Sequence, residues 1–484
     1  MGANTIQKIT LKSIVEYERN CYNFFTKLYK LVESDFRGIS TSYHNYRDSR
    51  EHYQYLFAFF FTRMKHIVGN IIKRKIIDET IEKIDEEDDT NLLCLSLFEA
   101  AAHYLVEYKI GTLKRLRPQH IDGFIITARP PNLIHESVKK AIRREEDYGK
   151  NLQGFAKEIF KYISVIKEAD LERHGIDLNF IRNGKIQQTC RHLQNRCQEK
   201  VKVAVTPFLD CLEFRFGSHI DNWPEPSQTP FWFEKISNPG EAKKWLRNKV
   251  LIPCRENNVD ILVLPELTVD KVLLEYLKKW LKENNREPAA DGYAGLLMTV
   301  AGSFHFKKKN GERFNTSTVL NHAGEVLWCQ DKLEMFSLDD HDIKKKPQIP
   351  QLLKISPNGG YERITCSHTV SIVDTPLGRL VVSICIDFFH HVEAYRSTGA
   401  NVFLVPAMTY QTIRLVKAAE FLAERNLAAS FLANSAWAAK KDKNEIHENG
   451  LSFYILPEVT RKSTLAEKKN GELLIYEFKK LTNS

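Results

Sequence analysis

The sequence contains nine cysteines but no pair at the C-x-x-C spacing. Zinc ribbons and dithiol redox sites use this spacing, so neither class of site is indicated. His103, His120 and His135 also lack the spacing of metal ligands. We therefore expect no metal and no other cofactor. Scattered unpaired thiols fit a reducing compartment, which predicts a cytoplasmic protein.

Long hydrophobic runs are absent as well. The longest, such as LFAFFF at 56–61, are too short to cross a bilayer. The first residues, MGANTIQKIT, have no apolar signal core, and Ile6 stands where a myristoylation motif needs Ser or Thr. We expect a soluble protein that has no membrane partner.

The composition is that of a globular protein. The chain has 484 residues, of which 43% are hydrophobic and 27% charged. This length exceeds a single ordinary core, so two domains are expected. The net charge of +9 permits an acidic partner without requiring one.

A mostly helical domain is predicted over residues 1–195. Apolar residues recur there at helical spacing in four stretches, at about 6–35, 48–86, 91–116 and 134–170. Two basic clusters, KIGTLKRLRPQH and KKAIRREED, are candidates for contact with nucleic acid or phosphate. Because acidic residues accompany them, solvated helix faces are the alternative interpretation. No polymerase or nuclease carboxylate motif occurs in this half.

The periodicity changes near residue 199. Short apolar strands such as EKVKVAV, DILVLPEL and HTVSIVDTP then alternate with helical stretches at about 240–257, 269–284 and 411–427. Residues 218–240 and 337–360 are predicted as loops, and GLSFYILP and GELLIYEF as a terminal strand pair. This alternation predicts a layered α/β domain over 199–484.

Cys385 lies at the centre of the stretch GRLVVSICIDFFHHVEAYRSTGANVFLVPA. The pattern predicts a buried strand that ends near Asp387, a crossover helix and a second buried strand. Ligands collect at the carboxyl ends of such strands, and a thiol placed there can act as a nucleophile. The alternative is an inert cysteine of the core.

Two further residues follow apolar strands in the same way. Glu266 ends ILVLPEL, and Lys332 follows EVLWCQ. If these strands share a sheet edge, a carboxylate, an ammonium and a thiol converge there. Such a set supplies a base, a partner for an oxyanion and a nucleophile.

The ordered motifs LPEL, AGSF, NTSTVLNHAGEVLWCQDKLEMF and GRLVVSICIDF resemble the nitrilase superfamily of carbon–nitrogen hydrolases. The similarity extends over about 199–480 and includes AERNLAASFLANSAW and ENGLSFYILP. It implies an α-β-β-α sandwich that forms homodimers or larger assemblies. It says nothing about residues 1–195.

The resemblance also implies roles for individual residues. Glu266 matches the general base of the family, Lys332 its catalytic lysine and Cys385 its nucleophile. The backbone amide of Ile386 would join Lys332 in stabilising an oxyanion. The expected intermediate is a thioester, which water or another acceptor releases.

One family feature has no clear match. A second glutamate commonly follows the lysine, but the loop here is LEMFSLDDHDIKKK. Glu334, Asp339 and Asp340 are the candidates for this second acid. His390 and His391 follow Cys385 on the predicted turn and helix, and we expect them to be surface residues because Glu266 already supplies the base.

Two functions are compatible with these patterns. The first is a hydrolase of carbon–nitrogen bonds other than peptide bonds, an amidase-type enzyme acting on a small amide. The second is an oligomerising sensor or effector, by analogy to bacterial defence proteins, whose basic helical domain binds nucleic acid or a protein partner. Turnover that depends on Cys385 distinguishes the first from the second.

Overall fold

We describe a computed structural model of the chain, which divides into two compact units within helix α9. The residues described are 3–34, 50–65, 67, 71–105, 118–121, 123–128, 163–197, 200–207, 212–218, 229–285, 295–339, 343, 353, 355–356, 358–409, 412–435, 440–442, 445–446, 452–457, 464–468 and 473–479. Each unit is described by itself below.

The first unit is mainly helical. Its helices are α1 (Ala3–Tyr17), α2 (Cys21–Ser34), α4 (Arg50–Met64), α5 (Arg74–Glu86) and α6 (Thr90–Tyr104). Helix α6 is apolar on most sides and packs at the centre, where Phe25 of α2 stacks on Phe98 at 5.1 Å. Asp89 caps its first turn by accepting the backbone N–H of Leu92. The predicted helical region is therefore confirmed in these stretches.

The first unit also contains a small antiparallel sheet that the sequence pattern missed. Its strands are β1 (Gln119–Ile121), β2 (Phe124–Ala128) and β3 (Ile163–Lys167). Strand β3 falls inside the helix expected at 134–170, so that expectation is wrong over 163–167. Three of the five residues in ISVIK are β-branched, which favours a strand at this position.

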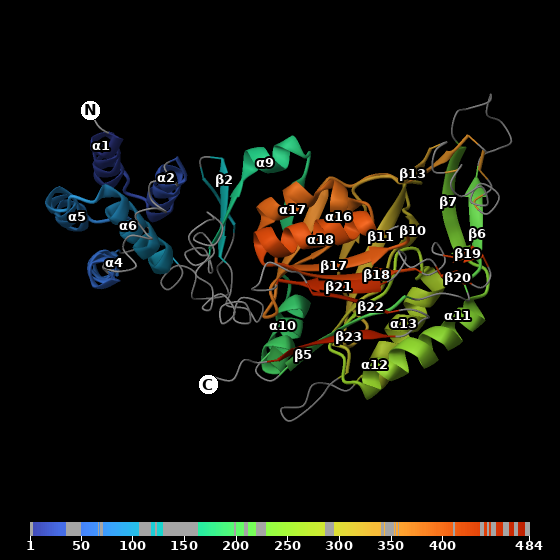
Figure 1. Ribbon diagram of the computed structural model, residues 1–484. Helices are drawn as coiled ribbons and strands as arrows, with labels where there is room; N and C mark the ends of the chain where they lie inside the picture. Colours follow the sequence, from blue (N-terminus) through green and yellow to red (C-terminus); the bar gives the residue numbers. More distant parts are fainter. Residues whose placement is uncertain are drawn as a thin grey trace. The chain divides into compact units, whose positions relative to one another are not determined.

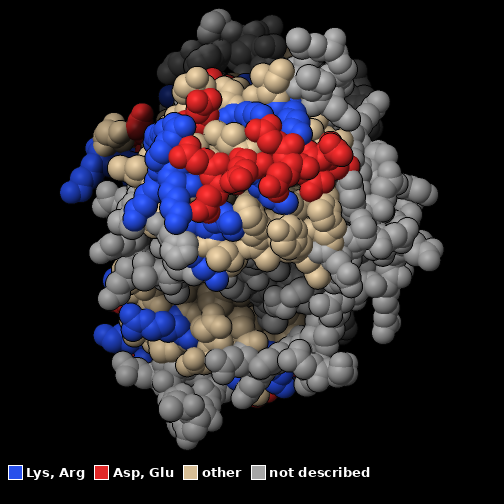
Figure 2. Space-filling model, turned by 90° about the vertical axis from the view of Figure 1, so that its left-hand side faces the viewer, with Lys and Arg blue, Asp and Glu red and all other residues tan. Residues whose placement is uncertain are grey.

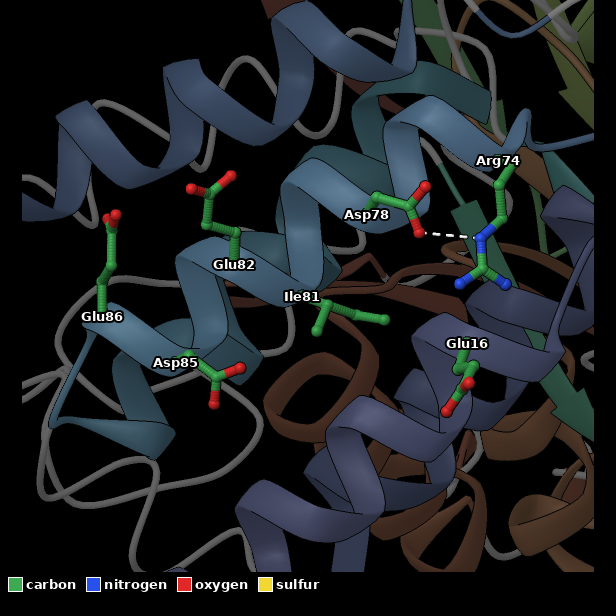
Figure 3. A pocket seen from close by; sticks show the side chains of 7 residues that line it. All are labelled: Glu16, Arg74, Asp78, Ile81, Glu82, Asp85 and Glu86. Carbon is green, nitrogen blue, oxygen red and sulfur yellow. Dashed lines mark ion pairs between the residues drawn. The ribbon is translucent and has the colours of Figure 1, made fainter.

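Acidic side chains form a band on the face shown in Figure 2, beside a group of Lys and Arg. A pocket between α1 and α5 is lined mainly by carboxylates and by Arg74, which pairs with Asp78 at 2.7 Å (Figure 3). The carboxylates of this pocket disfavour a phosphate there by like-charge repulsion. The basic clusters that predicted nucleic-acid contact are 109–120 and 139–147, and all but 118–120 lie outside the described residues. His120, on β1, pairs with Glu168 at 2.5 Å.

The second unit begins earlier than the expected boundary at 195–199. Strand β4 (Asp177–Phe180) pairs in parallel with β15 (Thr369–Asp374), and helix α10 (Gly184–Cys197) packs beside β5 (Lys200–Val205). The residues from 171 onward therefore belong to the α/β unit. They lack strong period-two alternation, which explains why the sequence pattern assigned them to the helical half.

Two seven-stranded sheets form the body of this unit (Figure 1). The first contains, in order, β10 (Phe304–Lys307), β11 (Arg313–Asn321), β9 (Met298–Val300), β8 (Ile261–Val263), β5 and β23 (Leu474–Lys479), with β12 (Val326–Asp331) paired to β11. The second contains β22 (Thr464–Lys468), β21 (Ser452–Leu456), β18 (Ala429–Asn434), β17 (Val402–Ala407), β16 (Arg379–Val382), β15 and β4. Phe431 of β18 meets Phe478 of β23 at 5.9 Å, so the sheets pack face to face.

Helices cover the outer face of each sheet. One layer consists of α16 (Asp387–His390), α17 (Val392–Thr398) and α18 (Ile413–Asn426). The other contains α11 (Pro239–Trp245), the π-helical stretch η4 (Leu246–Leu251), α12 (Ile252–Glu256) and α13 (Lys271–Asn284). Strand β17 is buried along its whole length, as its unbroken apolar sequence requires. The predicted α-β-β-α sandwich is confirmed.

A third sheet changes two loop assignments. Its strands are β13 (Ser337–Leu338), β14 (Gly360–Glu362), β7 (Thr229–Ile236) and β6 (Phe214–Ser218). Strand β7 lies within the expected loop 218–240, and β13 and β14 lie at the ends of the expected loop 337–360. Those predictions are wrong there, because Pro, Gly and Ser in the flanking sequence masked short strands. A small hairpin of β19 (Lys440–Asp442) and β20 (Glu445–Ile446) completes the unit.

The expected terminal strand pair is also wrong. GLSFYILP forms β21, which pairs with β18, whereas GELLIYEF forms β23, which pairs with β5 in the other sheet. Neighbouring strands in the sequence often pair, but here the chain crosses from one sheet to the other. The polypeptide thereby links the two layers that carry the site.

Candidate active site

Cys385 follows β16 and lies in a left-handed backbone conformation, with φ of 50°. Its N–H donates to the carbonyl of Pro406 at 2.8 Å, which keeps it beside β17 before the chain turns into α16. Such a conformation costs a non-glycine residue roughly 1–3 kcal/mol and must be held by its surroundings. The turn presents a buried thiol at the carboxyl end of the strand.

Glu266 follows β8 at the corresponding end of the other sheet. Its N–H donates to the carbonyl of Ala407 across the gap between the sheets. The chain turn around it requires Gly302 of the AGSF motif, because a Cβ at that position would stand 2.1 Å from the carbonyl oxygen of Pro265. This close approach explains why a glycine follows the neighbouring strand.

Lys332 comes directly after β12. Its N–H donates to the carbonyl of Asn315 on β11 at 2.8 Å. The next two residues are fixed by Asp387, whose carboxylate accepts the N–H groups of Leu333 at 2.8 Å and Glu334 at 3.0 Å. The loop after Lys332 is thereby attached to the helix that follows Cys385.

Glu362, at the end of β14, was not recognised in the sequence. Its side chain lies against Lys332, while its N–H donates to the carbonyl of Phe336 at 2.7 Å. It is thirty residues beyond the lysine, and no local motif marks it. It is the only acidic residue between Asp342 and Asp374, which is the one signal that could have found it.

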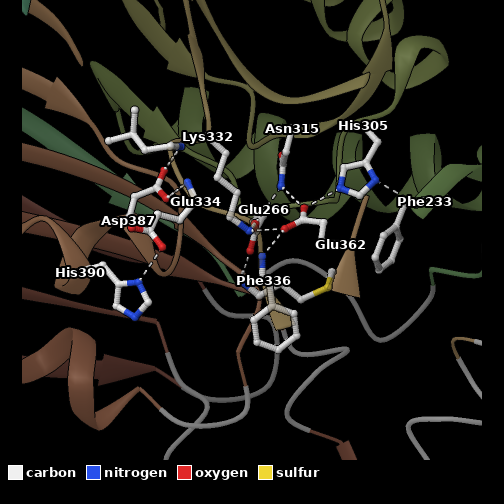
Figure 4. A network of polar contacts seen from close by, with 12 residues as sticks. Phe233, Glu266, His305, Asn315, Lys332, Glu334, Phe336, Glu362, Asp387 and His390 are labelled. Carbon is white, nitrogen blue, oxygen red and sulfur yellow. Dashed lines mark hydrogen bonds and ion pairs between the residues drawn. The ribbon is translucent and has the colours of Figure 1, made fainter. Parts of the chain in front are cut away.

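Lys332 connects the two glutamates (Figure 4). Its ammonium lies 2.9 Å from Oε1 of Glu266 and 2.8 Å from Oε2 of Glu362. Asn315 bridges the same pair through Nδ2, at 2.9 Å from Oε1 of each. The Cys385 thiol lies near Glu266, whose carboxylate raises the pKa of that thiol. The three residues selected from the sequence therefore converge in one buried cluster.

The carboxylates of Glu266 and Glu362 differ in the number of hydrogen bonds that they accept. Glu362 receives four donors, from Lys332, Asn315, His305 and the N–H of Phe336. A carboxylate offers about four acceptor sites, so Glu362 is saturated. Glu266 receives Lys332, Asn315 and the N–H of Met408, which leaves one acceptor site for the thiol.

Electrostatics keep the lysine charged. Burial alone would lower the pKa of Lys332, but the carboxylates of Glu266 and Glu362 outweigh it and hold this pKa well above its ordinary value. Burial likewise opposes ionisation of Glu362, yet the Lys332 charge and the His305 N–H lower the pKa of that carboxyl. The pair is therefore ionic, with every charge compensated by a close partner.

Cys385, in contrast to Lys332, is favoured in its neutral form. Burial first, and then the negative charge of Glu266, raise the pKa of Cys385 well above the value of a free thiol, although Lys332 opposes the shift. A resting thiolate is consequently disfavoured at neutral pH. Nucleophilic attack from this position requires transfer of the proton to a base, and Glu266 is the nearby carboxylate that raises the pKa of the thiol.

The candidates for the second acid lie elsewhere. Glu334 points away from the cluster and lies 3.2 Å from both His390 and His391, and Asp339 is exposed. Asp340 is outside the described residues. The acid beside Lys332 is Glu362, which replaces these candidates. His390 is exposed as expected, whereas His391 is buried.

Metal sites and membrane-spanning helices are two further features that the described residues can be compared with. In the part of the chain that the structure describes, no three or more His, Cys, Asp or Glu side chains are grouped as metal ligands. None of the described helices is both long and apolar enough to cross a membrane.

Comparisons with known proteins return the same class of fold. No family model and no curated protein matches the sequence. Among solved structures, Nit3 of Saccharomyces cerevisiae, a nitrilase-superfamily member, aligns at 16% identity over 58% of this chain and 91% of its own, with a TM-score of 0.35. An amidase from Nesterenkonia sp. AN1, with the acetamide moiety of fluoroacetamide added to its active-site cysteine, aligns at 14% identity over 58% and 90%, with a TM-score of 0.38.

The NitFhit protein of C. elegans aligns at 16% identity over 58% of this chain and 61% of its own, with a TM-score of 0.38. The structures found in this way are thus nitrilase-superfamily members, the family that the sequence motifs resemble. The similarities are remote, and the function proposed below rests on the geometry of Glu266, Lys332 and Cys385.

The ionised state of Glu362 predicts a pH dependence of stability. The pKa of Glu362 in the folded protein lies below its unfolded value of 4.5. The contribution of the ionised carboxylate to the free energy of unfolding is therefore fully present above pH 4.5 and is lost as the pH falls toward the folded pKa. Replacing Glu362 with Gln should therefore flatten the decline in the free energy of unfolding below about pH 4.5. Urea denaturation at a series of pH values measures this, and parallel acid limbs in both proteins would contradict it.

Proposed function

We propose that the α/β unit is a thiol-dependent carbon–nitrogen hydrolase of the amidase type. The observation that carries the proposal is the buried cluster of Cys385, Glu266 and Lys332. In it the nearby Glu266 raises the pKa of the thiol, and the ammonium lies 2.9 Å and 2.8 Å from two carboxylates. Cys385 is held as a neutral thiol and Lys332 as an ammonium, the states that a nucleophile with a separate base and an oxyanion partner need before the reaction begins.

The first step is attack by the thiol. Glu266 takes the proton of Cys385 as the sulfur forms a bond to the carbonyl carbon of an amide. Because Glu266 lies near the Cys385 thiol before the reaction begins, transfer of the thiol proton and formation of the carbon–sulfur bond can occur together. This route avoids the buried thiolate that the raised pKa of Cys385 disfavours.

Negative charge then develops on the substrate oxygen. An ammonium has three N–H donors, and the two glutamates occupy two of those on Lys332. The third is available for the oxyanion, and the amide of Ile386, next to the nucleophile, would supply a second donor. Lys332 thus remains charged and in place throughout.

The second half regenerates the enzyme. Glu266 returns its proton to the leaving nitrogen as the carbon–nitrogen bond breaks, which leaves a thioester on Cys385. It then deprotonates the incoming water, or another acceptor, as the thioester is cleaved. The acyl group leaves as an acid or as a new acyl product.

A panel of small amides tests the proposal directly. The full-length protein is incubated with each amide, release of ammonia or amine is measured, and the acyl adduct on Cys385 is sought by mass spectrometry after rapid acid quench. Turnover of at least one amide with an adduct at Cys385 supports the proposal. Turnover whose adduct lies on another residue would reject the assigned nucleophile.

Replacing Glu266 with Gln should separate two properties of the thiol. The Glu266 charge and hydrogen bond raise the pKa of Cys385, so removing them lowers the pH at which iodoacetamide alkylates Cys385 half-maximally, by about one unit or more. Amide turnover falls in the same variant because no base remains. Peptide mass spectrometry measures alkylation at Cys385, and an unchanged midpoint would contradict the contact between the two groups.

A further inference from the structure

His305 is a buried titratable residue that the reaction above does not use. It lies on β10, and its imidazole is completely shielded from solvent. One ring nitrogen faces the backbone of Phe233 on β7, and the other faces Glu362 (Figure 4). The ring of Phe233 stands perpendicular to it at 5.6 Å. The imidazole thus connects the third sheet to the charged cluster.

The two contacts define its protonation. The N–H of Phe233 donates to Nδ1 at 3.0 Å, so Nδ1 must carry a lone pair. Nε2 lies 2.6 Å from Oε1 of Glu362, an ionised acceptor, and therefore carries the proton. The backbone of β7 consequently selects the neutral Nε2–H tautomer.

This N–H completes the shell around Glu362. His305 and Asn315 donate to Oε1, while Lys332 and the N–H of Phe336 donate to Oε2. With four donors no acceptor site remains for a substrate or a water. Glu362 is then fixed in rotation about its terminal bond, and it holds the lysine at a defined position.

We propose that His305 is a positioning residue: its Nε2–H group holds Glu362 as a fixed anion, and Glu362 in turn positions Lys332 for the oxyanion. This inference rests on the function proposed above. Partners of this kind orient the groups that touch the substrate without contacting it themselves.

The tautomer is tested first, without any substrate. In a protein labelled with ¹⁵N-histidine, His305 should give a downfield Nε2–H proton resonance and an Nδ1 signal without an attached proton. The His305→Gln variant assigns the resonance by its loss. An Nδ1–H tautomer, or an imidazolium at neutral pH, would overturn the inference.

The positioning role is tested with two variants in the full-length chain. Gln at 305 keeps an N–H donor near Nε2, whereas Leu removes it at similar volume. Without the donor, Glu362 and Lys332 lose their fixed place beside Cys385, whose pKa Lys332 lowers. Alkylation of Cys385 by iodoacetamide should therefore slow about tenfold in His305→Leu, equivalent to one pKa unit, and recover in His305→Gln.

The amide that the panel identifies gives a second measurement. In His305→Leu, kcat should fall about 100-fold with little change in KM, as expected for a misplaced group that acts in the transition state. His305→Gln should recover most of this loss. His322→Leu, a buried histidine in the turn between β11 and β12, is the matched control for loss of a buried imidazole.

The outcomes separate the two proposals. Equal alkylation rates in all the proteins, or a His305→Gln variant as slow as His305→Leu, would overturn the positioning role. If no amide is turned over, the function proposed above fails, yet the resonance and the alkylation rates still decide the role of His305.

Discussion

Replacing Cys385 with alanine should abolish amide turnover, lowering kcat by about 10⁴-fold or more. The sulfur is the only group in the cluster that can form the thioester, and removal of a nucleophile typically costs this much. The fold should persist, since alanine fits the same buried turn after β16 and loses only one small side chain. Steady-state kinetics and the loss of the acyl adduct measure the effect.

Cys366 supplies the matched control. It is half-buried and lies near the cluster, where burial raises the pKa of its thiol. Glu266 is not among the groups that shift the pKa of this thiol, in contrast to Cys385, so Cys366→Ala should retain both turnover and the adduct. Equal turnover by Cys385→Ala and the parent would remove the proposed mechanism altogether.

Replacing Lys332 with methionine should have the largest effect on stability. Its removal leaves Glu266 and Glu362 side by side in a buried site without a compensating charge. Breaking a buried pair in this way typically costs about 3–5 kcal/mol. Turnover should be lost as well, because the third N–H donor disappears with the ammonium. Chemical denaturation followed by circular dichroism measures the first effect.

Lys202→Met is the control for this substitution. Lys202 lies on β5 of the same unit and pairs with Glu477 at 3.6 Å near the surface. Solvent screens that pair, so the free energy of unfolding should change by less than about 1 kcal/mol. A Lys332→Met variant as stable as this control would show that the two glutamates are not held as ions by the lysine.

Cys385, Glu266 and Lys332 could be selected as candidates because each follows a strand with a clear apolar pattern, and the resemblance to the nitrilase superfamily supplied their roles. Cys385 is preceded by LVVSI, Glu266 by ILVLP and Lys332 by EVLWCQ. Strand ends are local properties, and in a layered α/β domain such ends lie at a common edge. The expectation of one shared sheet edge is wrong, however, because β8 and β12 belong to one sheet and β16 to the other, so the three groups converge across the two facing sheets.

Glu362 and His305 could not be predicted in the same way. Glu362 ends a three-residue strand, and His305 lies on a strand of four residues. Both are held in place by β7, a strand that the sequence pattern assigned to a loop: β14 pairs with it, and the N–H of Phe233 on it donates to His305. Short strands carry too few residues for a period to emerge, so their pairing is decided by tertiary packing.

The sequence by itself determined that a layered α/β unit follows a helical region. It also determined that a thiol, a carboxylate and an ammonium lie at the ends of strands in that unit. Only the tertiary structure decided which carboxylate is free to accept a proton. Glu266 retains one acceptor site and Glu362 has none, because donors from separate strands and loops surround it. Such a difference arises from contacts between distant parts of the chain, and a local pattern does not encode those contacts.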